Sequence, residues 1–170
     1  MVIHPIEPVF DENSKVLILG SFPSVKSREA QFFYGHPQNR FWRVLAAVFE
    51  DAVPESTETK KACLLAHGVA LWDVIASCEI AGSSDATIRN VSVNDVGRIL
   101  DTAQIRTIFV NGKTAEKYYN RYLRPVLGRD AVCLPSTSPA NASWSMERLV
   151  EAWSVVRPRF DVCVQNPERK

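Results

Sequence analysis

The sequence predicts an α/β protein with a four-stranded parallel sheet, and two features of the chain lead to that expectation. Four short apolar runs, rich in β-forming residues, are typical of strands that are buried on both faces. Segments with the spacing of amphipathic helices fall between these runs. Strands that alternate with helices form parallel sheets through right-handed crossovers.

The expected strands are the four apolar runs, at residues 15–20, 68–75, 106–112 and 131–136. In the expected helices, apolar residues recur three and four positions apart, at residues 41–48, 93–100, 113–123 and 146–153. Residues 162–170 are expected to form a loose tail, so that a single domain spans residues 1–161.

The composition describes an ordinary globular domain without a strong overall charge. Its 170 residues are 46% hydrophobic and 23% charged, and the formal net charge of +1 indicates no general attraction to nucleic acid or membranes. Six basic against two acidic residues between positions 104 and 130 fit either a solvated helix face or a weak attraction to phosphate. Because we find no secretion signal and no membrane-spanning run, we expect a cytoplasmic monomer, nucleoid-associated if prokaryotic.

The cysteines do not form a recognisable ligand pattern. They are Cys63, Cys78, Cys133 and Cys163, and none belongs to a C-x-x-C pair or has a histidine at a spacing known for metal ligands. We therefore expect reduced, mostly buried thiols and no metal site.

Polar and aromatic residues gather after the expected strands. GSFPS follows the first strand, WD closes the second, NG follows the third and PSTSPAN follows the fourth. The carboxyl ends of parallel strands meet at one edge of the sheet, and open α/β sheets bind ligands there. The segment FYGHPQNRFW, residues 33–42, belongs to the same edge, so the sequence predicts a binding site at this rim.

Three of these segments, in this order, resemble motifs of the uracil-DNA glycosylase superfamily. They are GSFPS, FYGHPQNRFW and LPSTSPAN, and the resemblance covers about residues 16–141. Within the superfamily the chain is most similar to the hypoxanthine-DNA (deoxyinosine) glycosylase family, and mismatch-specific uracil glycosylases have a similar HPxNRFW segment. The resemblance implies a three-layer α/β/α sandwich around a four-stranded parallel sheet. It also implies an enzyme that flips a damaged base out of DNA and hydrolyses its N-glycosidic bond without a metal or organic cofactor.

Two departures from the superfamily pattern favour a purine substrate. Phe22 stands where the pattern GQDPY has a water-positioning aspartate, and Leu134 stands where HPSPLS-type motifs have a histidine that donates to a pyrimidine oxygen. The water-positioning role is therefore assigned to Asn39, whose amide can donate to and accept from a water. An asparagine just before a helix is also a favoured N-cap, and the two roles do not exclude each other.

The resemblance also suggests how a flipped base is held. Phe22 and Tyr34 align with pocket walls and could stack on a purine. Asp73 could accept a hydrogen bond from N1–H of hypoxanthine, a position where adenine has no hydrogen, or it could be a helix-cap or turn residue. Asn111 could contact the base or the DNA backbone, or belong to an ordinary turn. His36 is expected to shape its loop.

The expected DNA contacts lie in the same rim motifs. The PSTSPAN loop resembles the segment that holds phosphates and fills the gap left by the flipped base, although it is also a turn that leads into a helix. Lys113 and the helix after it add a salt-sensitive attraction. The candidate DNA-binding residues are Ser24, Lys113, Ser136, Ser138, Pro139 and Asn141.

Three functions remain open at this point. The first is a monofunctional glycosylase for deoxyinosine, since no lysine in the rim motifs could form a Schiff base. The second is a mismatch-type uracil-DNA glycosylase. The third, of a different class, is a catalytically silent domain that binds nucleic acid or a nucleotide.

Overall fold

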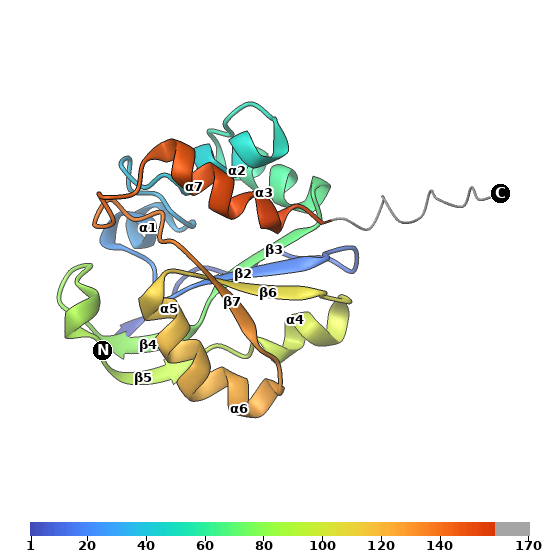
Figure 1. Cartoon of the computed structure of the whole chain (residues 1–170). Coiled ribbons are helices and arrows are strands. Elements are labelled where there is room, and N and C mark those ends of the chain that lie inside the picture. The colour runs from blue at the N-terminus through green and yellow to red at the C-terminus, as the bar shows by residue number, and fades with distance from the viewer. Residues whose placement is uncertain (159–170) are drawn as a thin grey trace.

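Four parallel strands form the centre of the molecule, which is a computed structural model that describes residues 1–158 (Figure 1). Their order across the sheet is β3-β2-β6-β7. The strands are β2 (Val16–Gly20), β3 (Val69–Asp73), β6 (Thr107–Asn111) and β7 (Ala131–Leu134). Every residue of β2 and β3 is buried, which explains why their sequences are continuous apolar runs. The expected tail at 162–170 lies outside the described residues.

Helices cover both faces of this sheet, so the predicted three-layer α/β/α sandwich is confirmed (Figure 1). One face carries α1 (Val25–Ala30), α2 (Phe41–Phe49), α3 (Thr57–Ala66) and α7 (Met146–Trp153). The other carries α4 (Gly97–Thr102), α5 (Lys113–Tyr118) and α6 (Arg124–Leu127). No helix of the described part of the chain is long and apolar enough to cross a membrane.

The two helices with the clearest apolar spacing form as expected. In α2, Phe41, Val44, Leu45 and Val48 are all buried, and the helix packs against α7. In α7, Leu149 and Trp153 point into the core, and the Ser145 hydroxyl accepts from the backbone N–H of Arg148 to cap the helix start.

The expectation for residues 68–75 is wrong in one respect, because the run divides between two sheets. β3 ends at Asp73, and β4 (Ile75–Glu79) begins two residues later in a separate antiparallel sheet of order β1-β4-β5. The backbone N–H groups of Val74 and Ile75 donate to the carbonyls of Gly20 and Ser21, so the chain bends away from the parallel sheet there. An apolar run alone does not reveal where a strand changes sheets.

Two expected helices also differ from the structure. Val93 ends strand β5 (Arg89–Val93), and the helix begins only at Gly97, so residue 93 is not helical. The helix expected at 113–123 divides into α5, a π-helical turn η2 (Tyr119–Leu123) and α6, in which Pro125 occupies the first turn. Its proline is tolerated there because first-turn N–H groups need no partner within the helix.

The remaining elements are short. They are β1 (Val2–Ile3), the 3₁₀ turn η1 (Asp85–Thr87) and the 3₁₀ turn η3 (Ser154–Val156). β1 pairs with β4, and this pairing carries the N-terminal segment to the carboxyl end of β3.

Candidate active site

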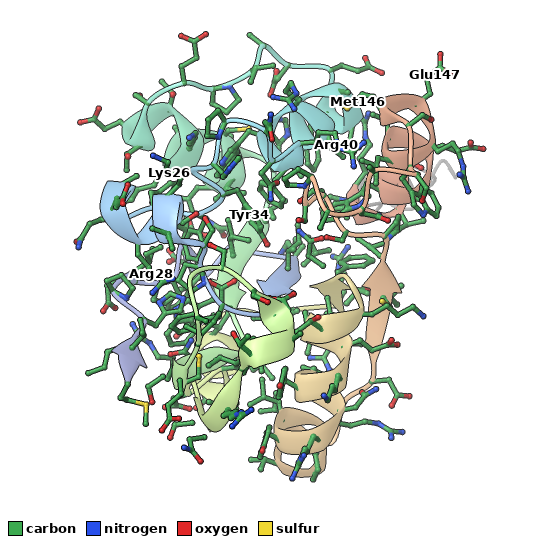
Figure 2. All side chains as sticks on the ribbon, turned by 90° about the vertical axis from the view of Figure 1, so that its left-hand side faces the viewer. Lys26, Arg28, Tyr34, Arg40, Met146 and Glu147 are labelled. Carbon is green, nitrogen blue, oxygen red and sulfur yellow. The ribbon has the colours of Figure 1, made fainter. Side chains whose placement is uncertain are left out.

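A cavity of about 950 Å³ opens at the carboxyl ends of the parallel strands. Figure 2 looks onto this edge, with Tyr34 between α1, which carries Lys26 and Arg28, and Arg40 near the start of α7. The cavity wall includes all the residues that the sequence singled out for base, water and DNA: Phe22, Ser24, Tyr34, Asn39, Asp73, Asn111, Lys113, Ser136, Ser138, Pro139 and Asn141. The structure therefore brings the predicted residues together, while the role of each stays a prediction.

The side-chain oxygen of Asn39 is fully engaged. It accepts from the backbone N–H of Phe41 at 2.9 Å and from the hydroxyl of Thr137 at 2.8 Å. A backbone N–H can only donate, so the amide cannot be flipped, and its Nδ2 has no hydrogen-bond partner among residues 1–158. Asn39 lies one residue before the N-cap of α2, which is Arg40, so the N-cap alternative is wrong in position, although its oxygen does bind the first N–H of the helix. The amide leaves two N–H donors for the cavity.

Thr137 connects Asn39 to Asn111, and it was not predicted as a site residue. Its side chain is fully buried, and its hydroxyl accepts from Nδ2 of Asn111 at 3.1 Å. Its backbone N–H donates to Oδ1 of Asn111 at 3.1 Å, so the amide of Asn111 is held at both ends. The only sequence signal for Thr137 was its place inside the PSTSPAN segment.

Tyr34 lies at the centre of the cavity wall. Its ring stacks on Phe41 with centroids 4.1 Å apart, so a base can reach only its opposite face. Its hydroxyl accepts from Nδ2 of Asn111 at 3.1 Å and keeps its own hydrogen for donation. Burial, and then the charge of Asp73, raise the pKa of Tyr34 well above its ordinary value, so the hydroxyl stays neutral at every physiological pH.

Position 20, the last residue of β2, must be glycine because the side chains of Asp73 and Tyr34 approach its backbone closely. A Cβ atom at this position would lie 2.3 Å from Oδ1 of Asp73 and 2.8 Å from the hydroxyl oxygen of Tyr34. Both groups therefore converge over the end of β2, and any larger residue would displace them.

Asp73 is buried and paired with a histidine that the sequence did not single out. Nε2 of His4 lies 2.7 Å from Oδ2 of Asp73, and the two side chains are 2% and 5% exposed. The backbone N–H of Ile6 donates to Nδ1 of His4, which therefore carries no hydrogen. The hydrogen of the neutral ring must be on Nε2, and Asp73 is the acceptor. The alternative of a helix-cap or turn residue is wrong for the Asp73 side chain.

Phe22 lines the cavity beside this pair. Its ring meets His4 edge to face at 5.9 Å, and the guanidinium of Arg28 lies 5.6 Å from the ring centroid. The sandwich of a purine between Phe22 and Tyr34 stays a prediction.

Arg40 holds the PSTSPAN loop in place, and it too was missed. Its guanidinium donates to the carbonyls of Asn141 and Trp144, and its backbone N–H donates to the carbonyl of Thr137 at 3.0 Å. Arg40 belongs to the FYGHPQNRFW segment, but nothing in the sequence shows which loop its side chain contacts.

The serines of this loop use their oxygens locally. The Ser136 hydroxyl accepts from the backbone N–H of Ser138, and the Ser138 hydroxyl accepts from that of Ala140. Because both oxygens act as acceptors, their O–H groups can still donate to a phosphate. Asn141 donates from Nδ2 to the carbonyl of Ser136.

Ser24 and Lys113 lie at the start of helices on two sides of the cavity. Ser24 caps α1, accepting from the backbone N–H of Ser27, so its hydroxyl has a structural role. Lys113 begins α5, and its side chain is 91% exposed, 4.0 Å from Glu116.

A parallel sheet whose carboxyl edge carries a cavity of aromatic, amide and carboxylate groups defines an α/β protein of the open-sheet class, in which ligand sites lie at this rim. The family follows from comparison with known proteins. Residues 7–157 match the model of the uracil DNA glycosylase superfamily, and the chain belongs to that superfamily.

Similar proteins from two Methanosarcina species support this assignment. A protein of Methanosarcina acetivorans named hypoxanthine DNA glycosylase is 34% identical over 158 residues, which cover 92% of this chain and 98% of the relative. One of the same name from Methanosarcina barkeri is 33% identical over 139 residues, covering 79% and 85%. The solution NMR structure of a candidate uracil DNA glycosylase from Methanosarcina acetivorans matches with a TM-score of 0.78 at 34% identity, covering 92% and 98%. The superfamily expected from the motifs is thereby confirmed.

Proposed function

We propose that this protein is a DNA glycosylase that flips hypoxanthine out of DNA and hydrolyses its N-glycosidic bond. The observation that carries the proposal is the carboxylate of Asp73, which lines the cavity and is paired with the buried ring of His4. The pair presents a carboxylate that can only accept. Hypoxanthine offers N1–H as a donor, whereas adenine offers a bare nitrogen, so the carboxylate favours hypoxanthine over adenine.

The lack of a hydrogen-bond donor at position 134 supports the same choice. Leu134 ends β7 at the cavity, is 4% exposed, and has no hydrogen to give to a uracil oxygen. The two relatives named hypoxanthine DNA glycosylase cover most of the chain, which also supports a purine substrate.

Asn39 positions the attacking water in this proposal. Its oxygen is occupied by Phe41 and Thr137, so it holds the water by donating from Nδ2 to the water oxygen. The water oxygen keeps a lone pair that forms the new bond to C1′ of the sugar, the C1′–N bond breaks, and the proton that the water loses ends on the departing base. The neutral Tyr34 hydroxyl supplies a donor to the cavity, where negative charge develops on the departing base.

The protein is proposed to be monofunctional, and Lys113 is the residue to check. It directly follows the NG motif of the rim and lines the cavity. Its 91% exposed side chain is unlike the desolvated amine that Schiff-base chemistry needs. Borohydride should therefore trap no covalent complex with inosine-containing DNA.

A substrate panel tests the proposal. The protein is incubated with oligonucleotides that carry deoxyinosine, uracil, xanthine or ethenoadenine, and abasic sites are then cleaved with alkali. Single-turnover cleavage of deoxyinosine should be faster than that of uracil in every pairing. Faster uracil cleavage would instead establish the mismatch-type alternative, and DNA binding without abasic sites would establish a silent binding domain.

A further inference from the structure

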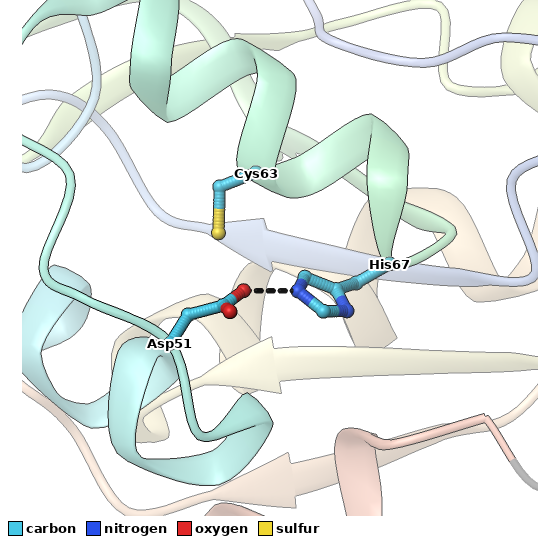
Figure 3. Close-up of side chains that lie close together, drawn as sticks. All are labelled: Asp51, Cys63 and His67. Carbon is cyan, nitrogen blue, oxygen red and sulfur yellow. Dashed lines mark hydrogen bonds and ion pairs between the residues drawn. The ribbon is translucent and has the colours of Figure 1, made fainter.

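A second cluster of chemically capable side chains lies far from the cavity, at the opposite edge of the sheet. Asp51, Cys63 and His67 each offer one ligand atom, and these atoms all lie within 4.8 Å of one another (Figure 3). His67 stands two residues before β3 begins, so the cluster is at the amino edge, whereas the catalytic cavity is at the carboxyl edge.

The three side chains are held by rigid elements. Cys63 lies on α3 and His67 caps its end, one helical turn apart, so both side chains fall on one face. The ring of His67 stacks on Phe49 with centroids 4.1 Å apart. Asp51 follows the left-handed residue Glu50 that ends α2, and its backbone N–H is tied to the carbonyl of Ala46.

We propose that Asp51, Cys63 and His67 form a binding site for a zinc-like divalent cation that clips the end of α2 to the end of α3. The donor set is a thiolate, an imidazole and a carboxylate, which suits zinc with a water as fourth ligand. Hard cations such as Mg²⁺ and Ca²⁺ prefer oxygen ligands and fit poorly. With the thiol deprotonated, the ligands carry two negative charges, which neutralise a divalent ion.

The distances are compatible with such an ion. Tetrahedral zinc with bonds of about 2.0–2.3 Å places its ligand atoms roughly 3.3–3.7 Å apart. Nε2 of His67 and Oδ2 of Asp51 are 2.5 Å apart and hydrogen-bonded, so the ion would separate this pair and draw the thiol inward. These side chains are accessible, at 26% exposed for His67 and 48% for Asp51.

An alternative role for the cluster is a nucleophilic Cys63 thiolate, but the surroundings of Cys63 disfavour the thiolate. Burial, and then the charge of Asp51, raise the pKa of the Cys63 thiol. Reactive thiols need a neighbourhood that stabilises the thiolate, which this one has only when a cation is present. The sequence pattern did not single out this pair, but a single helical turn brings the side chains of Cys63 and His67 close together.

Cobalt binding tests the site, with tag-free protein that carries Cys163→Ser to remove the thiol outside the described residues. The parent should bind one Co²⁺ with a cobalt–thiolate absorption band, and zinc should displace it. Cys63→Ser should abolish the band, and His67→Gln or Asp51→Asn should weaken binding at least tenfold. The matched controls Cys133→Ser and His36→Gln should bind like the parent. A parent without the band, or a Cys63→Ser variant that keeps it, would overturn the proposal.

Stability and activity provide the second readout. Zinc should raise the thermal midpoint of the parent but not that of Cys63→Ser, because only the native site binds the ion. Cleavage of deoxyinosine by Cys63→Ser should match the parent, which also proves that the variant is folded. An equal zinc-induced shift in both proteins would contradict the assigned ligands.

Discussion

Two side chains of the site are oriented by backbone N–H groups, which can donate a hydrogen bond but cannot accept one. The N–H of Phe41 fixes the amide of Asn39, and the N–H of Ile6 fixes the ring of His4. Each backbone donor determines what its partner presents to a ligand. Asn39 presents two N–H groups to the cavity, and Asp73 is held as an acceptor.

Asn39→Ala should reduce the single-turnover rate by a factor of about 10²–10³, the usual effect of losing a positioned polar group. Loss of the hydrogen bonds from Phe41 and Thr137 should lower the free energy of unfolding by about 1–2 kcal/mol. Rate and thermal midpoint are measured in the same preparation, with the neighbouring exposed amide variant Gln38→Ala as control. A lower midpoint with an unchanged rate per folded molecule would make Asn39 a structural residue only.

Asp73→Asn should change the choice of base more than the affinity for DNA. The amide can donate where the carboxylate can only accept, so excision of hypoxanthine should fall relative to the other bases in the panel. Rate ratios across the panel are compared with the dissociation constant for undamaged DNA. Unchanged ratios would show that Asp73 only supports the fold.

His4 acts as a positioning residue, and its variants separate positioning from packing. His4→Phe keeps a buried ring but removes the hydrogen bond to Oδ2 of Asp73, so it should reduce the preference for hypoxanthine. His4→Gln restores a donor at a similar reach and should recover part of that preference. Loss of stability in both variants without a change in base preference would contradict this role.

At the scale of elements, the site depends on one loop that is fastened to the start of a helix. Arg40 precedes α2 and binds the carbonyls of Asn141 and Trp144, while Trp153 of α7 donates to the carbonyl of Pro135. The loop that holds Thr137 and Ser136 is thus fixed from two helices. Its shape is therefore coupled to the packing of α2 on α7.

Arg40→Ala should loosen this loop and destabilise the protein by about 2 kcal/mol, because two partly buried carbonyls lose charge-assisted donors. DNA cleavage should decrease mainly because the protein binds DNA more weakly, and the rate at saturating DNA should change little. Urea unfolding and single-turnover rates at several DNA concentrations measure the two effects. Arg43→Ala, an exposed arginine on α2, should be neutral in both, and an equal loss in that control would rule out a specific clamp.

At the scale of the whole molecule, a buried phenol makes stability depend on alkaline pH. The folded-state pKa of Tyr34 is raised above the unfolded value of 10.0, so its contribution is complete below pH 10 and is lost as the pH rises. At pH 11 the loss should be about 1.4 kcal/mol. Tyr34→Phe should remove that part of the decline, measured as the difference in unfolding free energy between pH 9 and pH 11. If the unfolding free energies of the two proteins fell in parallel between pH 9 and pH 11, Tyr34 would not be the group responsible.

The sequence by itself determined the parallel sheet, the helices α2 and α7 and the rim on which the site lies. Strands buried on both faces must be continuously apolar, and a helix with one buried face must repeat its apolar residues every third or fourth position. These are local consequences of burial. The motif residues Asn39, Tyr34 and Asn111 could be placed together because the carboxyl ends of parallel strands share one edge.

Only the tertiary structure decided the partners that fix the chemistry. His4 meets Asp73 across 69 positions of sequence because β1 pairs with β4, and Arg40 meets Asn141 across 101. The bend at Val74 that sends one apolar run into two sheets is equally invisible in the sequence, since Val74 and Ile75 continue the apolar run past the end of β3. A hydrogen bond between distant residues depends on how the whole chain packs, and periodicity reports only which face of one element is buried.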